Sequence, residues 1–154
     1  FDKTLLLAGC LNHGHEILAA QLLGADLAYM GTRFIATRES QAPQPYKDML
    51  LTSKAADIVH TAAVSGVPAS FMRQSLENAG FDLPALQGKA QADGGSKLKP
   101  IDDEAKAWKT VWSAGQGVGD IHDLPTVEAL VRRLDAEYRV AQRASEQLAT
   151  HWPH

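Results

Sequence analysis

The sequence is poor in cysteine and in long apolar runs, and each shortage excludes a class of protein. Cys10 is the only cysteine among 154 residues, so no disulfide can form within the chain and no zinc site built on paired thiolates is possible. No apolar run approaches the roughly 20 residues that span a bilayer, and the N-terminal residues lack a signal-peptide pattern. We therefore expect a cytoplasmic protein without a membrane partner.

An excess of positive charge is also absent. The chain has 15 Lys and Arg residues against 18 Asp and Glu residues, which gives a formal net charge of −3. This balance provides no general attraction to nucleic acid, so we expect no nucleic-acid partner. With 45% apolar and 21% charged residues, the composition is that of a globular chain long enough to bury a core. The sequence starts at Phe1 without a methionine, and we expect it to be part of something longer.

The first 33 residues predict a strand, a helix and a second strand. Apolar segments at 4–8 and 27–29 are typical of buried strands. Between them Ile17, Leu18 and Leu22 recur at helical spacing, and Gly24 is placed to end the helix. This order predicts parallel strands joined by a crossover helix, and thus an α/β fold.

The rest of the chain is predicted to be mostly helical. A strand is expected over 57–64, and residues 81–103 contain enough glycine, proline and polar residues to predict a flexible surface loop. Helices are expected over 34–39, 46–51, 69–79, 105–112 and 125–150. The last of these has an apolar face formed by Val127, Leu130, Val131, Leu134, Tyr138 and Ala141.

Each of the first two predicted strands is followed by a glycine turn. Gly9 and Cys10 follow the first strand, and Met30, Gly31 and Thr32 follow the second. Glycine lets a backbone approach an anion closely, and a new helix directs free N–H groups at it. In (β/α)₈ barrels the loops after the last two strands bind a phosphate in this way. The alternative is that both turns only join strands to helices.

Several blocks resemble the C-terminal half of nitronate monooxygenases, the FMN enzymes formerly called 2-nitropropane dioxygenases. The blocks lie at 7–10, 24–34, 65–69 and 112–119, and the Gly-Thr-Arg-Phe sequence at 31–34 is the most specific. The resemblance implies an α/β fold that is the C-terminal part of a TIM-type (β/α)₈ barrel with a mostly helical extension. It also implies an enzyme that oxidises alkyl nitronates with dioxygen through FMN.

The same resemblance implies which residues hold the cofactor. The residues expected around the FMN phosphate are Gly9, Cys10, Tyr29, Met30, Gly31 and Thr32. Ser113 and Gln116 could lie near the flavin or the substrate, or belong to a tight turn only. Many relatives have Gly-Gly where this chain has Gly9 and Cys10. A cysteine fits if its position contributes only an N–H group; if glycine torsions are required, the loop must differ.

The charged and catalytic candidates are less specific. Arg33 either binds the phosphate directly or lies on the helix surface and pairs with a nearby carboxylate. His60, within a predicted strand, either faces the ligand pocket or is a hydrogen-bonded core histidine. The catalytic residues are unknown from the sequence, and His60 is only a weak candidate. In the resembling family a histidine deprotonates neutral nitroalkanes, and no residue of this chain matches that motif. His13 and His15 lack further ligands, so no metal site is expected.

These inferences give three regions and an incomplete barrel. Residues 1–42 are expected to be the last two βα units with the phosphate site, 43–123 a lid or insert, and 124–150 a helix packed on the barrel. Eight such units need about 250 residues, so a missing N-terminal barrel segment is the expected partner; homo-oligomer formation stays open. The alternatives are an FMN-dependent enoyl-acyl-carrier-protein reductase and a non-catalytic binding or assembly module.

Overall fold

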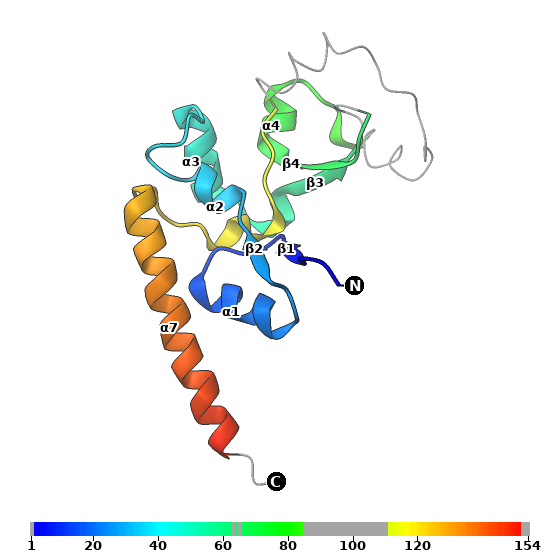
Figure 1. The fold of residues 1–154 in the computed structure, drawn as a ribbon. Coiled ribbons are helices and arrows are strands. Elements are labelled where there is room, and N and C mark those ends of the chain that lie inside the picture. The colour runs from blue at the N-terminus through cyan, green and yellow to red at the C-terminus, as the bar shows by residue number, and fades with distance from the viewer. Residues whose placement is uncertain (1, 63, 65, 85–110, 152–154) are drawn as a thin grey trace.

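The computed structural model describes residues 2–62, 64, 66–84 and 111–151 (Figure 1). The described chain has an α/β fold with two small sheets and a long C-terminal helix. The strands are β1 Leu6–Ala8, β2 Leu27–Tyr29, β3 Ile58–Thr61 and β4 Ala69–Met72. The helices are α1 Gly14–Leu22, α2 Thr32–Ile35, α3 Gln44–Thr52, α4 Arg73–Asn78 and α7 Val127–His151, with short 3₁₀ turns η1 Ala55–Asp57 and η2 Gln116–Asp120.

The predicted strand-helix-strand unit is confirmed. β1 and β2 pair in parallel, with Leu6 opposite Leu27, and α1 is the crossover between them. The Glu16 carboxylate accepts a hydrogen bond from the N–H of His13 at 2.9 Å, which satisfies a backbone donor at the start of α1. Gly24 follows the helix with φ +97°, as expected for a glycine that ends a helix.

The β1–β2 sheet is more exposed than the apolar sequence predicts. Leu6 is 48% exposed and Leu27 is 54% exposed. The sheet has only two strands within the described residues, so neither strand is enclosed by neighbours on both sides. Continuous apolar character is typical of parallel strands covered on both faces, and here that cover is incomplete.

The region over 69–79, predicted as one helix, is instead a strand followed by a shorter helix. β4 pairs antiparallel with β3, placing Ile58 opposite Met72, and only α4 is helical. The N–H of Met72 donates to the Trp112 carbonyl at 2.9 Å, a contact that an intrahelical hydrogen bond would preclude. The helix predicted over 34–39 is also displaced, since α2 begins at Thr32 and ends at Ile35. For residues 69–72, pairing with β3 overrides the local preference for a helix.

Two predicted segments fall largely outside the described residues. The loop expected over 81–103 is described only through Pro84, and the helix expected over 105–112 only at Val111 and Trp112, which are not helical.

Two adjoining clusters of buried side chains form the core, and both lie downstream of β2. One joins α2, α3, β4 and η2, and the other joins β3, β4 and α4. Their buried members are Ala36, Leu50, Met72, Ala114, Val118 and Ile121 in the first, and Val59, Phe71, Leu76, Leu83 and Val111 in the second. The core therefore packs against the end of α2, the helix that follows the turn after β2.

The predicted C-terminal helix is confirmed as α7, which packs along α1 (Figure 1). Leu130 and Leu134 of its apolar face are buried. The two helices approach closely at Gly14, whose N–H donates to Glu137 Oε2 at 2.7 Å. A Cβ added to Gly14 would lie 2.0 Å from the Leu134 carbonyl oxygen. No helix in the described ranges combines the length and apolarity needed to cross a membrane.

We predict that Gly14→Ala destabilises the protein by roughly 1–3 kcal/mol, because the new methyl group would overlap the backbone of α7 and force the helices apart. Urea denaturation followed by far-UV circular dichroism measures the effect. Gly119→Ala is the matched control, since a Cβ there would meet its nearest atom at 3.8 Å, an ordinary contact. Equal stability of the two variants would show that α1 and α7 do not need this close approach.

Candidate functional site

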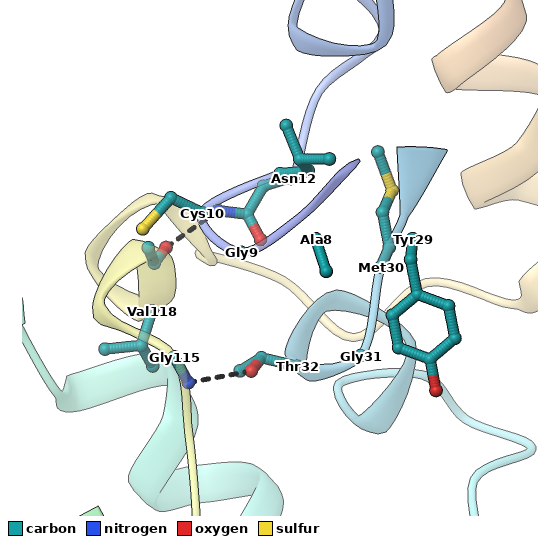
Figure 2. Close-up of a pocket in the computed structure, with 12 residues that line it drawn as sticks. Ala8, Gly9, Cys10, Asn12, Tyr29, Met30, Gly31, Thr32, Gly115 and Val118 are labelled. Atoms are coloured by element: carbon teal, nitrogen blue, oxygen red, sulfur yellow. Dashed lines mark hydrogen bonds between the residues drawn. The ribbon is translucent and has the colours of Figure 1, made fainter. Parts of the chain in front are cut away.

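A pocket of about 190 Å³ lies at the carboxyl ends of β1 and β2 (Figure 2). Three loops from distant parts of the sequence form it: the turn after β1, the turn after β2, and the glycine-rich segment 115–118. The lining residues are Ala8, Gly9, Cys10, Leu11, Asn12, Tyr29, Met30, Gly31, Thr32, Gly115, Gly117 and Val118. All six residues predicted for the phosphate site are among them.

The turn after β1 has two consecutive residues with positive φ. Gly9 has φ +103° and Cys10 has φ +53°. The second position therefore does use a torsion that glycine adopts without cost, and Cys10 adopts it despite its side chain. The thiol is exposed, and Figure 2 shows the sulfur on the side of the glycine-rich segment, away from Tyr29. The loop keeps a glycine-type shape although a cysteine replaces the second glycine.

The turn after β2 presents donors at the start of α2. The first amide that donates within this helix is that of Phe34, to the Gly31 carbonyl at 3.0 Å. The N–H groups of Thr32 and Arg33 therefore have no acceptor inside the helix. Because α2 is only four residues long, these individual donors matter more than a helix dipole. A Cβ added to Gly31 would meet no atom within 4 Å, so the space beside the turn is open.

The glycine-rich segment closes the pocket against both turns. The N–H of Gly115 donates to Thr32 Oγ1 at 3.0 Å, and the side-chain amide of Asn12 donates to the Gly117 carbonyl at 2.7 Å (Figure 2). A Cβ added to Gly117 would lie 2.9 Å from Cys10 Cα. Glycine at 117 thus allows backbone to pack on backbone, which explains why this segment must lack side chains there.

The two polar residues expected near the ligand in this segment do not line the pocket. The Ser113 carbonyl accepts a hydrogen bond from the Tyr46 hydroxyl, and Ser113 forms an isolated β-bridge with Phe71. Gln116 is exposed. Their neighbours Gly115 and Gly117 line the pocket instead, together with Val118. Burial raises the pKa of Tyr46, in accord with a protonated hydroxyl that donates to Ser113.

The donors of the pocket suit an anion held without a charged side chain. None of its twelve lining residues is acidic or basic. Because Thr32 Oγ1 accepts from Gly115, its own proton remains available to donate into the pocket. Backbone amides in turns form concave donor sites for phosphates in the same way. The arrangement can therefore bind a phosphate through N–H and O–H groups.

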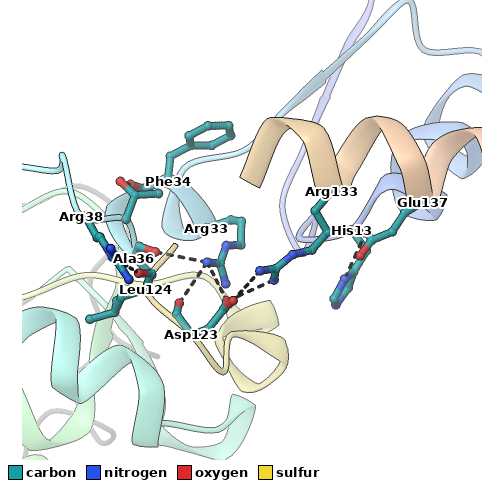
Figure 3. A network of polar contacts seen from close by, with 10 residues as sticks. His13, Arg33, Phe34, Ala36, Arg38, Asp123, Leu124, Arg133 and Glu137 are labelled. Carbon is teal, nitrogen blue, oxygen red and sulfur yellow. Dashed lines mark hydrogen bonds and ion pairs between the residues drawn. The ribbon is translucent and has the colours of Figure 1, made fainter. Parts of the chain in front are cut away.

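Arg33 does not line this pocket. Its side chain is 3% exposed, and Nη2 donates to the Asp123 backbone carbonyl at 3.0 Å and to Asp123 Oδ1 at 3.2 Å (Figure 3). Of the two interpretations from the sequence, the structure shows the carboxylate pair, although the arginine is buried and not on the helix surface. Burial lowers the pKa of Arg33, and the charge of Asp123 opposes this shift.

Asp123 was not singled out by the sequence, yet it joins two arginines. Its carboxylate accepts hydrogen bonds from Arg133 Nη1 at 3.2 Å and Nη2 at 2.5 Å, in addition to the one from Arg33. The hydrogen bond from Arg133 and the charges of both arginines hold the pKa of Asp123 below its usual value. No local pattern could have identified this residue, because Arg33 lies 90 positions away in the sequence.

The histidines lie away from the pocket or contribute no ligand set. His60 is exposed on β3, where its Nδ1 lies 3.3 Å from the hydroxyl of Ser70, and it is not a lining residue. The rings of His13 and His15 stack with centroids 5.2 Å apart. Within the described part of the chain, no group of three or more potential metal ligands is found.

We predict that Cys10→Gly stabilises the protein by roughly 1 kcal/mol, because glycine relieves the left-handed torsion that a side chain disfavours. Cys10→Ala is the matched control: it removes the thiol but keeps the torsional cost, so its free energy of unfolding should stay within about 0.5 kcal/mol of the original. Urea titration measures both. A glycine variant less stable than the alanine variant would contradict the torsional argument.

We also predict an acid-dependent role for Asp123. Since its pKa is lowered in the folded state, its stabilising contribution is present above the ordinary carboxyl pKa of about 3.9 and is lost as pH falls through the lowered value. Asp123→Asn should therefore reduce the free energy of unfolding at pH 7, and the difference from the original protein should shrink below about pH 4. Urea titrations at a series of pH values test this. A difference that is constant from pH 7 to pH 3 would contradict it.

Solved structures with a similar fold cover nearly the whole chain. A mutant of FabK from Thermotoga maritima matches with a TM-score of 0.71 at 23% identity, over 96% of this chain and 46% of that chain. Nitroalkane oxidase from Streptomyces ansochromogenes matches with a TM-score of 0.64 at 29% identity, over 94% of this chain and 42% of that chain. Both are TIM-barrel enzymes, so the α/β fold described above corresponds to part of such an enzyme.

The sequence comparisons point to one family. A nitronate monooxygenase from Paraburkholderia phytofirmans is 31% identical over 150 residues, which cover 94% of this chain and 40% of that protein. This chain thus spans less than half the length of the relative. The family model described as nitronate monooxygenase matches residues 4–137. The chain belongs to the nitronate monooxygenase family.

Proposed function

We propose that this chain supplies the phosphate-binding part of the FMN site in a flavin-dependent enzyme that oxidises alkyl nitronates with dioxygen. One observation carries the proposal: the turns after two adjacent parallel strands and the segment 115–118 converge on a single pocket of amide and hydroxyl donors. In barrel enzymes the loops at this end of the strands hold the ligand's phosphate. Family membership supports a flavin as the ligand.

The residues present fit the phosphate of FMN. Open space borders Gly9 and Gly31. The amides of Thr32 and Arg33 are available as hydrogen-bond donors, and Thr32 adds a hydroxyl. The exposed ring of Tyr29 and the side chain of Met30 form one wall of the pocket beside these donors. When bound, FMN would supply the electron transfer between the nitronate and dioxygen.

A nitronate is the proposed substrate because of what its oxidation demands. A nitronate already has carbanion character, so the protein is asked mainly to position substrate and cofactor and not to remove a proton. Relatives named nitronate monooxygenase and nitroalkane oxidase, at 31% and 29% identity, support this substrate class. Among the described residues we therefore assign no general base; His60 is exposed on β3, outside the pocket.

We further propose that the chain is the C-terminal part of a (β/α)₈ barrel whose remaining strands come from an N-terminal segment. Exposed apolar side chains lie in or beside the two strands and at the end of α1, and these are Leu5, Leu6, Leu22, Leu23 and Leu27. Unpaired edges of a parallel sheet and exposed leucines are unfavourable in water, and further strands and helices would cover both. The coverage of 40% of the relative's length leaves room for such a segment.

The leading test uses the purified full-length protein with two variants of one residue. Thr32→Val removes the hydroxyl but keeps the shape, and we expect it to weaken FMN binding by about tenfold to a hundredfold, the effect of losing a hydrogen bond to a charged group. Thr32→Ser keeps the hydroxyl and should bind FMN nearly as tightly as the original protein. Flavin fluorescence titration gives the dissociation constants.

The same preparations identify the reaction. Oxygen uptake that depends on an alkyl nitronate is the expected result, reduced in proportion to flavin loss in Thr32→Val. NAD(P)H oxidation driven by an enoyl thioester, without nitronate-dependent oxygen uptake, would favour the enoyl-acyl-carrier-protein reductase. Failure to bind FMN at all would contradict both activities and favour a non-catalytic binding or assembly module.

A further inference from the structure

A network of charged side chains connects the turn after β2 to the C-terminal helix (Figure 3). It begins at Arg33, the residue directly after Thr32, whose buried Nη2 is bound to the main chain and carboxylate of Asp123. The same carboxylate accepts both Nη groups of Arg133 on α7. The carboxylate of Asp123 therefore ties α2 to the first turns of α7.

One helical turn further along α7, Glu137 contacts the residues that follow the turn after β1. Its Oε2 accepts the hydrogen bond from the N–H of Gly14 and lies 3.6 Å from His13 Nδ1, directly after the turn that contains Asn12. Residues 133 and 137 are four apart and thus share one face of α7. This face is linked to the turn after β2 through Asp123 and to the turn after β1 through Gly14.

Further contacts hold the segment before α7 against the residues that follow α2. The N–H of Arg38 donates to the Pro125 carbonyl at 3.0 Å, and its Nε donates to the Leu124 carbonyl at 3.2 Å. The carboxylate of Glu39 accepts from the N–H of Val127 at 3.0 Å. Hydrogen bonds thus hold α2 at its first residue, Thr32, and hold the residues that follow the helix, which restricts its rotation relative to the pocket.

We infer that Arg33 and Asp123 are positioning residues for the anion site: they do not contact the ligand but fix α2 so that the amide and hydroxyl of Thr32 face the pocket. The inference rests on the proposed phosphate-binding function. Its physical basis is that a guanidinium 3% exposed must keep its ionic partner, since an unpaired buried charge is strongly unfavourable. Any rotation of α2 that turned Thr32 away would also pull Arg33 from Asp123.

The test separates phosphate binding from binding of the rest of the flavin. FMN and riboflavin differ only in the phosphate, so the ratio of their dissociation constants reports on the anion site alone. In the full-length protein, Asp123→Asn should reduce the preference for FMN over riboflavin by about threefold to tenfold, with riboflavin affinity nearly unchanged. A general structural weakening would lower both affinities and leave the ratio in place.

Asp135→Asn is the matched control. Asp135 also pairs with an arginine, Arg139, through an exposed contact at 2.9 Å on α7. Among the described residues it forms no hydrogen bond or ion pair with Arg33, Asp123, Arg133 or Glu137. Its variant should keep the original ratio. If Asp123→Asn does not fold, Arg133→Gln is tested in its place, because this variant removes only the hydrogen bonds between Asp123 and α7. The preference for FMN over riboflavin should then fall by about twofold to fivefold.

The possible failures are distinguishable. If the original protein binds riboflavin as tightly as FMN, the phosphate site itself is refuted and the inference falls with it. If the original protein prefers FMN and the Asp123 or Arg133 variant keeps the full preference, the phosphate site stands and the positioning role is overturned.

Discussion

The burial of one charge, that of Arg33, sets much of the arrangement around the pocket. A guanidinium that is 3% exposed requires a carboxylate beside it, and Asp123 meets this need. Asp123 can do so only if the segment before α7 lies against α2. That position fixes where α7 starts, and the length of the helix then brings Glu137 to the N–H of Gly14. The two turns of the pocket are thus held by one continuous set of contacts.

Glycine serves different physical purposes around this pocket. Gly9 supplies a positive φ, whereas Gly117 and Gly14 are positions where backbone meets backbone and a Cβ would not fit. Gly31 and Gly9 border open space, which is where a ligand could approach the main chain. A sequence shows the glycines but not which of these reasons applies, because the neighbouring atoms come from distant segments.

Local patterns predicted those elements whose stability is local. Helical spacing and a terminal glycine were sufficient for α1, and an apolar stripe was sufficient for α7. The strand β4 was missed because its residues also suit a helix, and pairing with β3 and contact with residues 112–113 decided the outcome. A ligand site was expected at the first two turns, and the structure shows a pocket there. In the third segment Ser113 and Gln116 were named as possible ligand neighbours, whereas Gly115 and Gly117 line the pocket. Polar side chains are easier to recognise in a sequence as ligand contacts than a main chain that contributes only its own atoms.

The sequence by itself determined the α/β character of the first unit, the two glycine turns at the ends of its strands, and the family resemblance carried by residues 31–34. Only the tertiary structure decided that Gly115 binds the Thr32 hydroxyl and that Arg33 faces Asp123 instead of the pocket. The reason is physical: turns and helices depend on neighbours within a few residues. The direction of a buried charge or a hydroxyl depends on partners 80 to 90 residues away, which chain folding brings together.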